Sequence, residues 1–418
     1  MKMIELTREQ FEEFAAKNHY KNYCQTANYG IVMAETGFEY TFVGYTTNEY
    51  EILAAGMFLV KKLGNKYSYA YCPKGYLVDY NNKDLLRRFT NNLIKYYKRK
   101  KIIFMKINPE IPIATIDYNN NYERNDLPNS SLIEDLKKLG FKRRKEIEPL
   151  QLLQPKLTAL VNLKDYDVNK LEKRFRNKIK STENKGLEIE IADATKIEYL
   201  YEFIKNMKDR SINYYRNFLN SFKKTNQADL ILVKINYEKY LISSKKKVEE
   251  EEIRNNELNE RLQKDPSEKN LNEKMNSDKI LEEYKQDIIY ATTGLKKNEE
   301  TYIAGAIVIK YENKITILIS GVDKNYNHLN PNYFLHNQIL NMYKDEYEIA
   351  DINGIANDFS EDSKYAGLNK FKMGFKPTIT EYIGELDMII NEWIFKLVNR
   401  NNMLSNEFTK KKDTTNKE

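Results

Sequence analysis

Two stretches of this chain present apolar runs and glycines in the same order. The first begins at LAAGMFLV (53–60), continues through YSYAYCPKG and KIIFMKIN, and ends at LGFK (139–142). The second begins at IAGAIVIK (303–310), continues through ITILISGV and DING, and ends at MGFK (373–376). The order predicts two copies of one α/β unit with a cleft between them, where ligands usually bind. Coincidence of short apolar runs is the alternative interpretation.

The first copy, Gly56 to Gly140, is longer than the second, Gly305 to Gly374. The surplus is about the length of the segment IPIATIDYNNNYERND, which has no counterpart in the second copy. We expect this segment to be an irregular loop.

Composition places the chain in a broad class. With 418 residues it can form two or three domains that each bury a core. Cys24 and Cys72 form no metal-binding or disulfide pattern, so we expect a reducing compartment and no metal. No apolar run could span a bilayer and the N-terminal segment is charged throughout, which predicts a soluble cytoplasmic protein. The net charge of +7 favours a polyanionic or membrane-surface partner, although an AT-rich genome would also enrich lysine.

The order of elements predicts α/β layers. TREQFEEFAAK has a capping-box pattern in Thr7 and Gln10, LLRRFTNNLIKYYKRK is an amphipathic helix, and IIFMKI is apolar enough for a buried strand. Strand, helix and strand in succession favour an α/β (α+β) fold. We expect a first domain over 1–155 and a second over 156–398.

Residues 236–292 interrupt this rhythm with two long polar helices around the turn DPSE. One heptad position holds Leu241, Val248, Asn255 and Leu262, and the return arm has Leu281 and Ile288 seven residues apart. The pattern predicts an antiparallel helical hairpin, a coiled-coil arm with a thin apolar seam. It either docks on the protein or a partner, or is a mobile insertion with no binding role. Residues 399–418 lack periodicity and are predicted to be disordered.

Common catalytic motifs are missing from the sequence. There is no GxxxxGK[ST] loop, no GxGxxG after a strand, no HExxH and no GxSxG. ATP hydrolysis, nicotinamide redox, zinc proteolysis and triad hydrolysis therefore lose support. The three histidines, His19, His328 and His336, are interpreted as structural or surface residues.

Cations beside aromatic residues remain as candidates. In DRSINYYRN, Arg210 and Tyr214 are four residues apart, so they share a helix face that could bind a phosphorylated ligand. Arg176 lies in the basic segment EKRFRNKIK. A solvated basic helix face is the alternative in both places.

The segment NKFKMGFKP closes the second copy. If FKMGF is a strand or the entry to one, Lys372 has apolar neighbours in Phe371 and Met373, and Gly374 lets a ligand approach closely. A lysine there could stabilise an oxyanion or hold a phosphate. If side chains alternate strictly between the two faces of such a strand, Lys372 would instead point to solvent.

Several segments together carry a family resemblance. They are NYCQTANYG, YAYCPKGYLVDY, KINPEIP, DRSINYYRN, GIANDFSEDSKYAGLNKFKMGF and EYIGELD. Their order and spacing over residues 1–398 resemble the FemABX family, and the hairpin looks like the arm of its FemA and FemB branch. The resemblance implies two tandem GNAT-like domains and transfer of an amino acid from aminoacyl-tRNA to the stem peptide of a lipid-linked peptidoglycan precursor.

The resemblance also implies partners and a site. The partners would be aminoacyl-tRNA and the precursor at the inner membrane face, with a homo- or hetero-oligomer of related transferases as a further option and no cofactor. Lys372 would contact the acceptor diphosphate or polarise the ester carbonyl. The expected substrate-binding residues are Arg210, Tyr214, Phe371, Gly374, Arg176, Gln25 and Asn108.

Two positions depart from the family pattern. Asn108 precedes Pro109 where many members have Asp-Pro, and Met33 replaces a frequent lysine. An amide at position 108 cannot act as a general base. Two alternatives therefore stay open: a tRNA-binding or scaffolding paralogue without turnover, and a GNAT acetyltransferase, whose pyrophosphate loop the sequence lacks.

Overall fold

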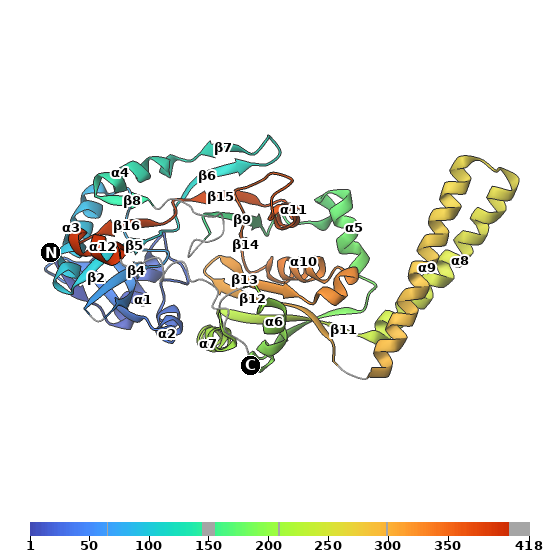
Figure 1. The fold of residues 1–418 in the computed structure, drawn as a ribbon, viewed down its shortest axis with the longest axis horizontal. Helices are drawn as coiled ribbons and strands as arrows, with labels where there is room; N and C mark the ends of the chain where they lie inside the picture. Colours follow the sequence, from blue (N-terminus) through green and yellow to red (C-terminus); the bar gives the residue numbers. More distant parts are fainter. Residues whose placement is uncertain (65, 144–154, 208–209, 298–299, 401–418) are drawn as a thin grey trace.

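The body of the protein is built on two mixed β-sheets (Figure 1). The computed structural model describes residues 1–64, 66–143, 155–207, 210–297 and 300–400. Within these ranges, a seven-stranded sheet has the order β1-β2-β3-β4-β5-β16-β8, and a nine-stranded sheet has the order β10-β11-β12-β13-β14-β9-β15-β6-β7. The predicted α/β (α+β) class is confirmed.

The elements run as follows. Those up to residue 143 are β1 (Lys2–Glu5), α1 (Arg8–Lys17), α2 (Ala27–Ala34), β2 (Glu39–Thr46), β3 (Ile52–Leu63), β4 (Tyr67–Cys72), α3 (Lys83–Arg99), β5 (Ile102–Ile107), β6 (Pro112–Asp117), β7 (Glu123–Asp126), α4 (Leu132–Lys138) and β8 (Phe141–Arg143). Those from residue 155 are β9 (Leu157–Asn162), α5 (Lys173–Thr182), β10 (Leu187–Ala192), α6 (Ile197–Ile204), α7 (Ile212–Lys223), β11 (Ala228–Ile235), α8 (Tyr237–Lys264), α9 (Glu268–Lys297), β12 (Tyr302–Tyr311), β13 (Lys314–Val322), α10 (Pro331–Tyr343), β14 (Ile349–Gly354), α11 (Ala366–Met373), β15 (Thr378–Tyr382), β16 (Leu386–Ile389) and α12 (Glu392–Arg400).

The sequence repeat corresponds to a repeated substructure. In the first copy, β2, β3 and β4 are antiparallel, α3 crosses over, and β5 pairs in parallel with β4. In the second copy, β11, β12 and β13 are antiparallel, α10 crosses over, and β14 pairs in parallel with β13. The ends of β5 and β14 are therefore equivalent positions in the two copies.

Strands are exchanged between the two halves of the chain. The segment expected to be an irregular loop forms the hairpin of β6 and β7, and β6 pairs with β15 in the nine-stranded sheet. That expectation was wrong because β15, which lies far away in sequence, pairs with β6, and local sequence does not reveal this partner. In the other direction, β16 inserts between β5 and β8. Each sheet thus contains strands from both of the ranges 1–155 and 156–398.

A buried lysine accounts for part of this exchange. Every residue of β5 is buried, including Lys106, whose exposed fraction is 0 %. Its Nζ donates to Asp387 at 2.6 Å and lies 3.1 Å from Glu385, both from the β16 segment. A buried ammonium is costly without such partners, so β16 supplies what β5 needs.

Local patterning explains the helices. α1 begins with the predicted capping box of Thr7 and Gln10. α3 buries Phe89, Leu93 and Tyr97 along one face, as its periodicity predicts. Aromatic packing also joins the halves, since the Tyr23 ring contacts those of Phe218 and Phe222 in α7 with centroids 6.4 Å and 6.1 Å away.

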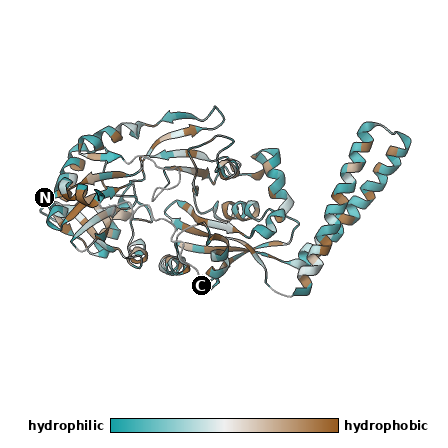
Figure 2. Cartoon of the chain, viewed as in Figure 1, coloured by the Kyte–Doolittle hydropathy of each residue, from teal (hydrophilic) through white to brown (hydrophobic). Residues whose placement is uncertain are grey.

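The helical hairpin expected over 236–292 is present as α8 and α9, and α9 continues to Lys297. It projects from the body as an arm, and most of its residues are hydrophilic (Figures 1 and 2). Ser244, Glu251 and Leu258 are buried in its seam. At its root, the Tyr240 hydroxyl donates to Asp287 at 2.6 Å.

The segment NKFKMGF differs from its expected conformation. Lys372 and Phe371 lie in helix α11, not in a strand. The following residues turn into β15, which carries the pairing to β9 and β6. No helix among the described residues is both long and apolar enough to cross a membrane. The tail over 399–418 falls outside the described residues apart from its first two positions, which end α12.

Candidate functional site

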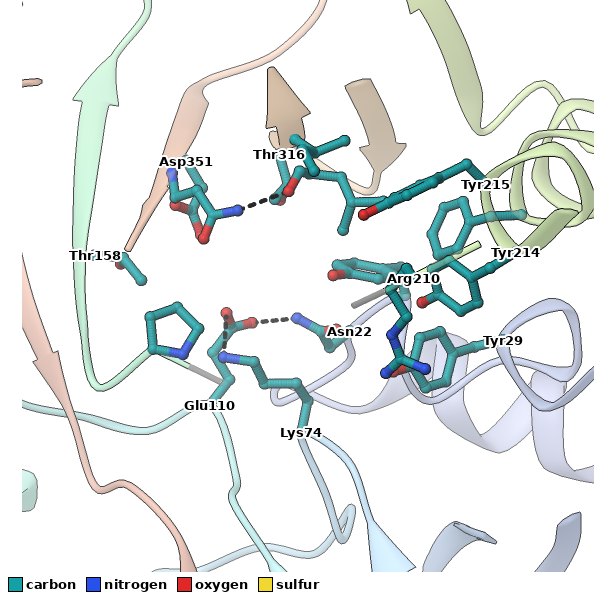
Figure 3. Close-up of a pocket in the computed structure, with 16 residues that line it drawn as sticks. Asn22, Tyr29, Lys74, Glu110, Thr158, Arg210, Tyr214, Tyr215, Thr316 and Asp351 are labelled. Atoms are coloured by element: carbon teal, nitrogen blue, oxygen red, sulfur yellow. Dashed lines mark hydrogen bonds and ion pairs between the residues drawn. The ribbon is translucent and has the colours of Figure 1, made fainter. Parts of the chain in front are cut away.

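A polar cavity of about 210 Å³ lies where the two repeats meet (Figure 3). It is lined by Asn22, Tyr23, Tyr29, Lys74, Glu110, Pro155, Thr158, Arg210, Tyr214, Tyr215, Phe218, Thr316, Leu318, Ile319, Asp351 and Asn353. These residues come from α2 and the loop before it, from the loops after β4 and β5, from β13 and β14, from the start of β9 and from around α7. The repeat thus places polar groups at equivalent strand ends on both sides of the cavity.

Glu110, just after β5, is the centre of an ion-pair network. Both of its carboxylate oxygens lie 3.0 Å from Lys314 Nζ, and Oε2 accepts from the Asn22 amide at 2.6 Å. Lys74 Nζ lies 3.6 Å from Oε1. Burial opposes ionisation of Glu110, but Lys314, Lys74 and Asn22 together outweigh it and lower its pKa to about 2. Glu110 is therefore a permanent anion at neutral pH.

Asp351, in β14, is the second carboxylate of the cavity. It is 6 % exposed, and one oxygen accepts from the backbone amide of Asn353 at 2.8 Å. Burial raises its pKa; Lys314 opposes this and the Glu110 anion reinforces it. The two carboxylates thus have pKa values displaced in opposite directions by their surroundings.

Gln25 and Asn108, two of the predicted binding residues, support the turn that carries Lys74. The Gln25 amide donates to Pro73 O at 2.6 Å and accepts from Met57 N at 2.8 Å. Asn108 Oδ1 accepts from the backbone amide of Lys74 at 2.8 Å. Lys74 has a left-handed backbone, with φ of 52°, so these bonds fix an otherwise unfavourable conformation. Neither Gln25 nor Asn108 lines the cavity itself.

The opposite wall carries the predicted arginine and tyrosine pair. The Arg210 guanidinium lies over the Tyr214 ring, 4.6 Å from its centroid. Figure 3 shows Arg210, Tyr214 and Tyr29 together on one side, with Glu110, Thr158 and Asp351 on the other. Burial raises the pKa of Tyr214, so its phenol stays neutral and can donate a hydrogen bond. An anionic group would find a planar cation with neutral donors beside it.

Lys372 lies outside this cavity, beneath the end of β14. It is buried, and its Nζ donates to the carbonyl of Gly354 at 2.6 Å. Asn353, the preceding residue, lines the cavity. The predicted site residues therefore form two groups joined through β14.

Of the remaining predicted residues, Phe371 and Gly374 pack beside Lys372 against an aromatic cluster, and Arg176 lies on the neighbouring helix α5. Phe371 packs against Phe175 of α5, with ring centroids 6.3 Å apart. A side chain at Gly374 would meet the Phe175 ring at 2.0 Å, so this glycine serves helix packing. Arg176 donates to the Asn169 carbonyl at 2.7 Å on the adjoining surface.

The sequence predictions missed Lys74, Glu110, Lys314 and Asp351. Lys74 and Glu110 lie within YAYCPKGYLVDY and KINPEIP, and Asp351 lies in DING, so each belongs to a segment already singled out. The usable signal was the repeat, because polar residues at equivalent strand ends converge when the copies pack together. No group of three or more His, Cys, Asp or Glu side chains in the described ranges is placed to hold a metal ion.

Fold and site define a two-repeat α/β protein with a charged cavity at the junction of its repeats. Residues 6–402 match the FemAB family, to which the chain therefore belongs. It is 28 % identical to the aminoacyltransferase FemA of Staphylococcus epidermidis over 95 % of this chain and 98 % of that protein. It is 26 % identical to FemA of Staphylococcus aureus over 94 % and 97 %. The crystal structure of FemX superposes with a TM-score of 0.71 at 21 % identity, covering 95 % of this chain and 99 % of FemX.

Proposed function

We propose that this protein is an aminoacyltransferase that moves an amino acid from aminoacyl-tRNA to the stem peptide of a lipid-linked peptidoglycan precursor, forming the interpeptide bridge. Membership of the FemAB family and end-to-end alignment with relatives named aminoacyltransferase FemA support the reaction class. The structural observation that carries the proposal is the buried, charged cavity between the repeats, with Arg210 and Tyr214 facing two carboxylates.

The chemistry is aminolysis of an activated ester and needs no cofactor. An amine of the stem peptide or growing bridge attacks the aminoacyl carbonyl, and tRNA leaves. Holding the reactants in line can supply about 7 kcal/mol or more of the barrier reduction.

Charge accounts for the proposed partners. A net charge of +7 favours binding of the tRNA polyanion. The lipid-linked acceptor would bring the enzyme to the inner face of the membrane as a peripheral protein. Arg210 and Tyr214 would bind an anionic part of the acceptor. Lys372 would polarise the ester carbonyl or contact the diphosphate, which requires its ammonium to leave the Gly354 carbonyl beneath the cavity.

The test is transfer of radiolabelled glycine, alanine and serine, each charged on tRNA, to purified lipid-linked precursor. We expect one amino acid to be transferred by the wild type, with strong loss in Lys372→Ala and Arg210→Ala. An exposed control, Lys344→Ala, should transfer normally. A folded wild-type protein that binds tRNA and precursor but transfers none of the three would instead indicate a binding-only paralogue.

A further inference from the structure

The two carboxylates of the cavity differ in their hydrogen bonding. Both carboxylate oxygens of Glu110 already have protein partners, since Asn22 and Lys314 contact them at 2.6 to 3.0 Å and Lys74 lies 3.6 Å from one of them. Asp351 has one backbone hydrogen bond, from Asn353, and its second oxygen accepts none from any described residue. A ligand can therefore bind the Asp351 carboxylate without displacing a protein group.

The surroundings of Asp351 suit a cationic ligand. The charged or titratable groups that face it are Lys314 from β13, Glu110 and Lys74 from the loops after β5 and β4, and Tyr382 at the end of β15. Lys314 is already bound by both oxygens of Glu110. Lys74 is directed at Glu110 and at the Tyr382 ring, whose centroid is 5.1 Å from Nζ. Both lysines are thus engaged elsewhere.

A neutral acceptor lies on the same wall. The Thr158 hydroxyl is buried beside the cavity, and its hydrogen-bonding neighbour is the Tyr382 hydroxyl at the end of β15. Figure 3 places Thr158 between Asp351 and Glu110. A hydroxyl that donates its own proton to Tyr382 keeps lone pairs on its oxygen, and these can accept from a ligand in the cavity. A primary ammonium has three donors and no acceptor, which fits this wall.

We propose that Asp351 is a catalytic residue that binds the acceptor's primary amine and takes its proton, with Thr158 as a further acceptor and Glu110 as the fixed neighbouring anion. This inference rests on the aminoacyl transfer proposed above. It also assigns an orientation, because the amine lies on the Asp351 wall and the anionic part of the acceptor lies toward Arg210 across the cavity.

The proposed step balances as follows. The acceptor enters as an ammonium and gives one proton to the Asp351 carboxylate. The freed nitrogen lone pair forms a bond to the aminoacyl carbonyl carbon. The ester carbon–oxygen bond breaks, its electron pair stays on the ribose oxygen of tRNA, and that oxygen takes the second proton lost by the nitrogen. Asp351 then releases its proton to solvent.

The geometry explains why the amide at Asn108 is compatible with turnover. Asn108 uses its oxygen to hold the Lys74 backbone and does not line the cavity. Asp351 lines the cavity and offers an unoccupied oxygen. The proton acceptor therefore comes from the second repeat, at the strand end equivalent to β5.

The first test is kinetic. Asp351→Asn keeps the shape and the acceptor for Asn353 N, so it should fold. We expect kcat to fall about 100-fold or more, the usual contribution of general-base catalysis, with KM for the precursor changed less than kcat. The wild-type kcat should decline as the pH falls through the pKa of Asp351, and this acid limb should vanish in the variant. Formate should partly restore kcat to Asp351→Ala, which a purely structural role would not allow.

The second test needs no turnover. Calorimetry would compare binding of the lipid-linked precursor in detergent micelles with that of the same precursor acetylated on its amine. The wild type should prefer the free amine, and Asp351→Asn should lose that preference. Asp345→Asn, exposed after α10, is the matched control and should behave like the wild type.

The outcomes separate the two proposals. The role of Asp351 would be overturned by an unchanged kcat in Asp351→Asn, or by a preference for the free amine that is the same in Asp351→Asn and the wild type. Either result would leave aminoacyl transfer intact. A wild type that transfers nothing would overturn the proposed function, and the amine preference would still decide whether Asp351 binds an ammonium.

Discussion

The Lys314 ammonium lies 3.0 Å from each carboxylate oxygen of Glu110. Lys314 begins β13 in the second repeat, whereas Glu110 follows β5 in the first. Both side chains are largely buried, with exposed fractions of 19 % and 11 %. This ion pair links the repeats directly at the cavity, so its charge state affects both stability and the site.

Acid should destabilise the protein through Glu110. The pKa of Glu110 is about 2 in the folded state. An unfolded glutamate has a pKa of about 4.3, so the stabilisation is fully present above that value and is lost as the pH falls toward the folded value. The contribution is on the order of 3 kcal/mol. Urea unfolding at about pH 6 and about pH 3 should show a larger loss for the wild type than for Glu110→Gln.

The same variant should be destabilised at neutral pH. Removing one partner of a buried ion pair leaves the other uncompensated, which costs about 3 to 5 kcal/mol. Glu346→Gln, exposed near the end of α10, is the control and should change the free energy of unfolding by less than about 0.5 kcal/mol. Equal stability of the two variants would show that Lys314 finds another partner.

Adding a methyl group at Gly374 should disrupt the packing of α11 on α5. The new carbon would lie 2.0 Å from the Phe175 ring. Overpacking of this kind typically costs about 1 to 3 kcal/mol, or more where the neighbour is held. Gly367→Ala is the control in the same helix, because its new carbon meets nothing within 4 Å. Thermal unfolding should show a lower Tm for Gly374→Ala and an unchanged or higher Tm for Gly367→Ala.

Asn108 should tolerate aspartate better than alanine. Aspartate keeps an oxygen for the Lys74 backbone amide, which now donates at 2.8 Å, whereas alanine leaves that buried amide unpaired. We expect Asn108→Ala to lose about 1 to 3 kcal/mol of stability and most transfer activity, and Asn108→Asp to retain activity within several-fold. A large gain in kcat for Asn108→Asp would show that a carboxylate at this position acts as a base.

Shortening the arm should leave tRNA binding nearly intact. Residues 248–281 carry more acidic than basic side chains, so this part of the arm offers the phosphate backbone little attraction; the lysine run 245–247 lies outside it. A short turn in place of residues 248–281 would keep the root contacts of Tyr240 with Asp287. We expect KM for charged tRNA to change less than about two-fold and its salt dependence to stay the same. A large rise in that KM would assign the arm a role in binding tRNA.

Local pattern determined much of the fold. The capping box at Thr7, the apolar face of α3 and the two long helices of the arm depend on neighbours in sequence, so the sequence alone predicts them. The repeat likewise predicted two α/β units and the general position of a cleft. Motif order was sufficient to indicate the family, because short segments keep their spacing along the chain.

Only the tertiary structure decided the strand exchange and the conformation of NKFKMGF. The segment of β6 and β7 carries weak local signals, and its strands form because β15 offers a partner edge and burial. Lys372 lies in a helix because Phe371 of α11, and Gly374 just past its end, pack against Phe175 of α5, a contact between distant parts of the chain. Long-range pairing of this kind overrides local propensity.

In the site, too, some residues could be predicted from local sequence and others only from the packing of distant segments. Arg210 and Tyr214 were predictable because they share one helix face at short spacing. Lys74, Glu110, Lys314 and Asp351 come from four separate segments, and each one alone is an ordinary charged residue near a strand end. The sequence by itself determined the repeated units that carry these residues. Only the packing of one repeat on the other brought their charges together in a buried cavity, where low polarity makes them interact strongly.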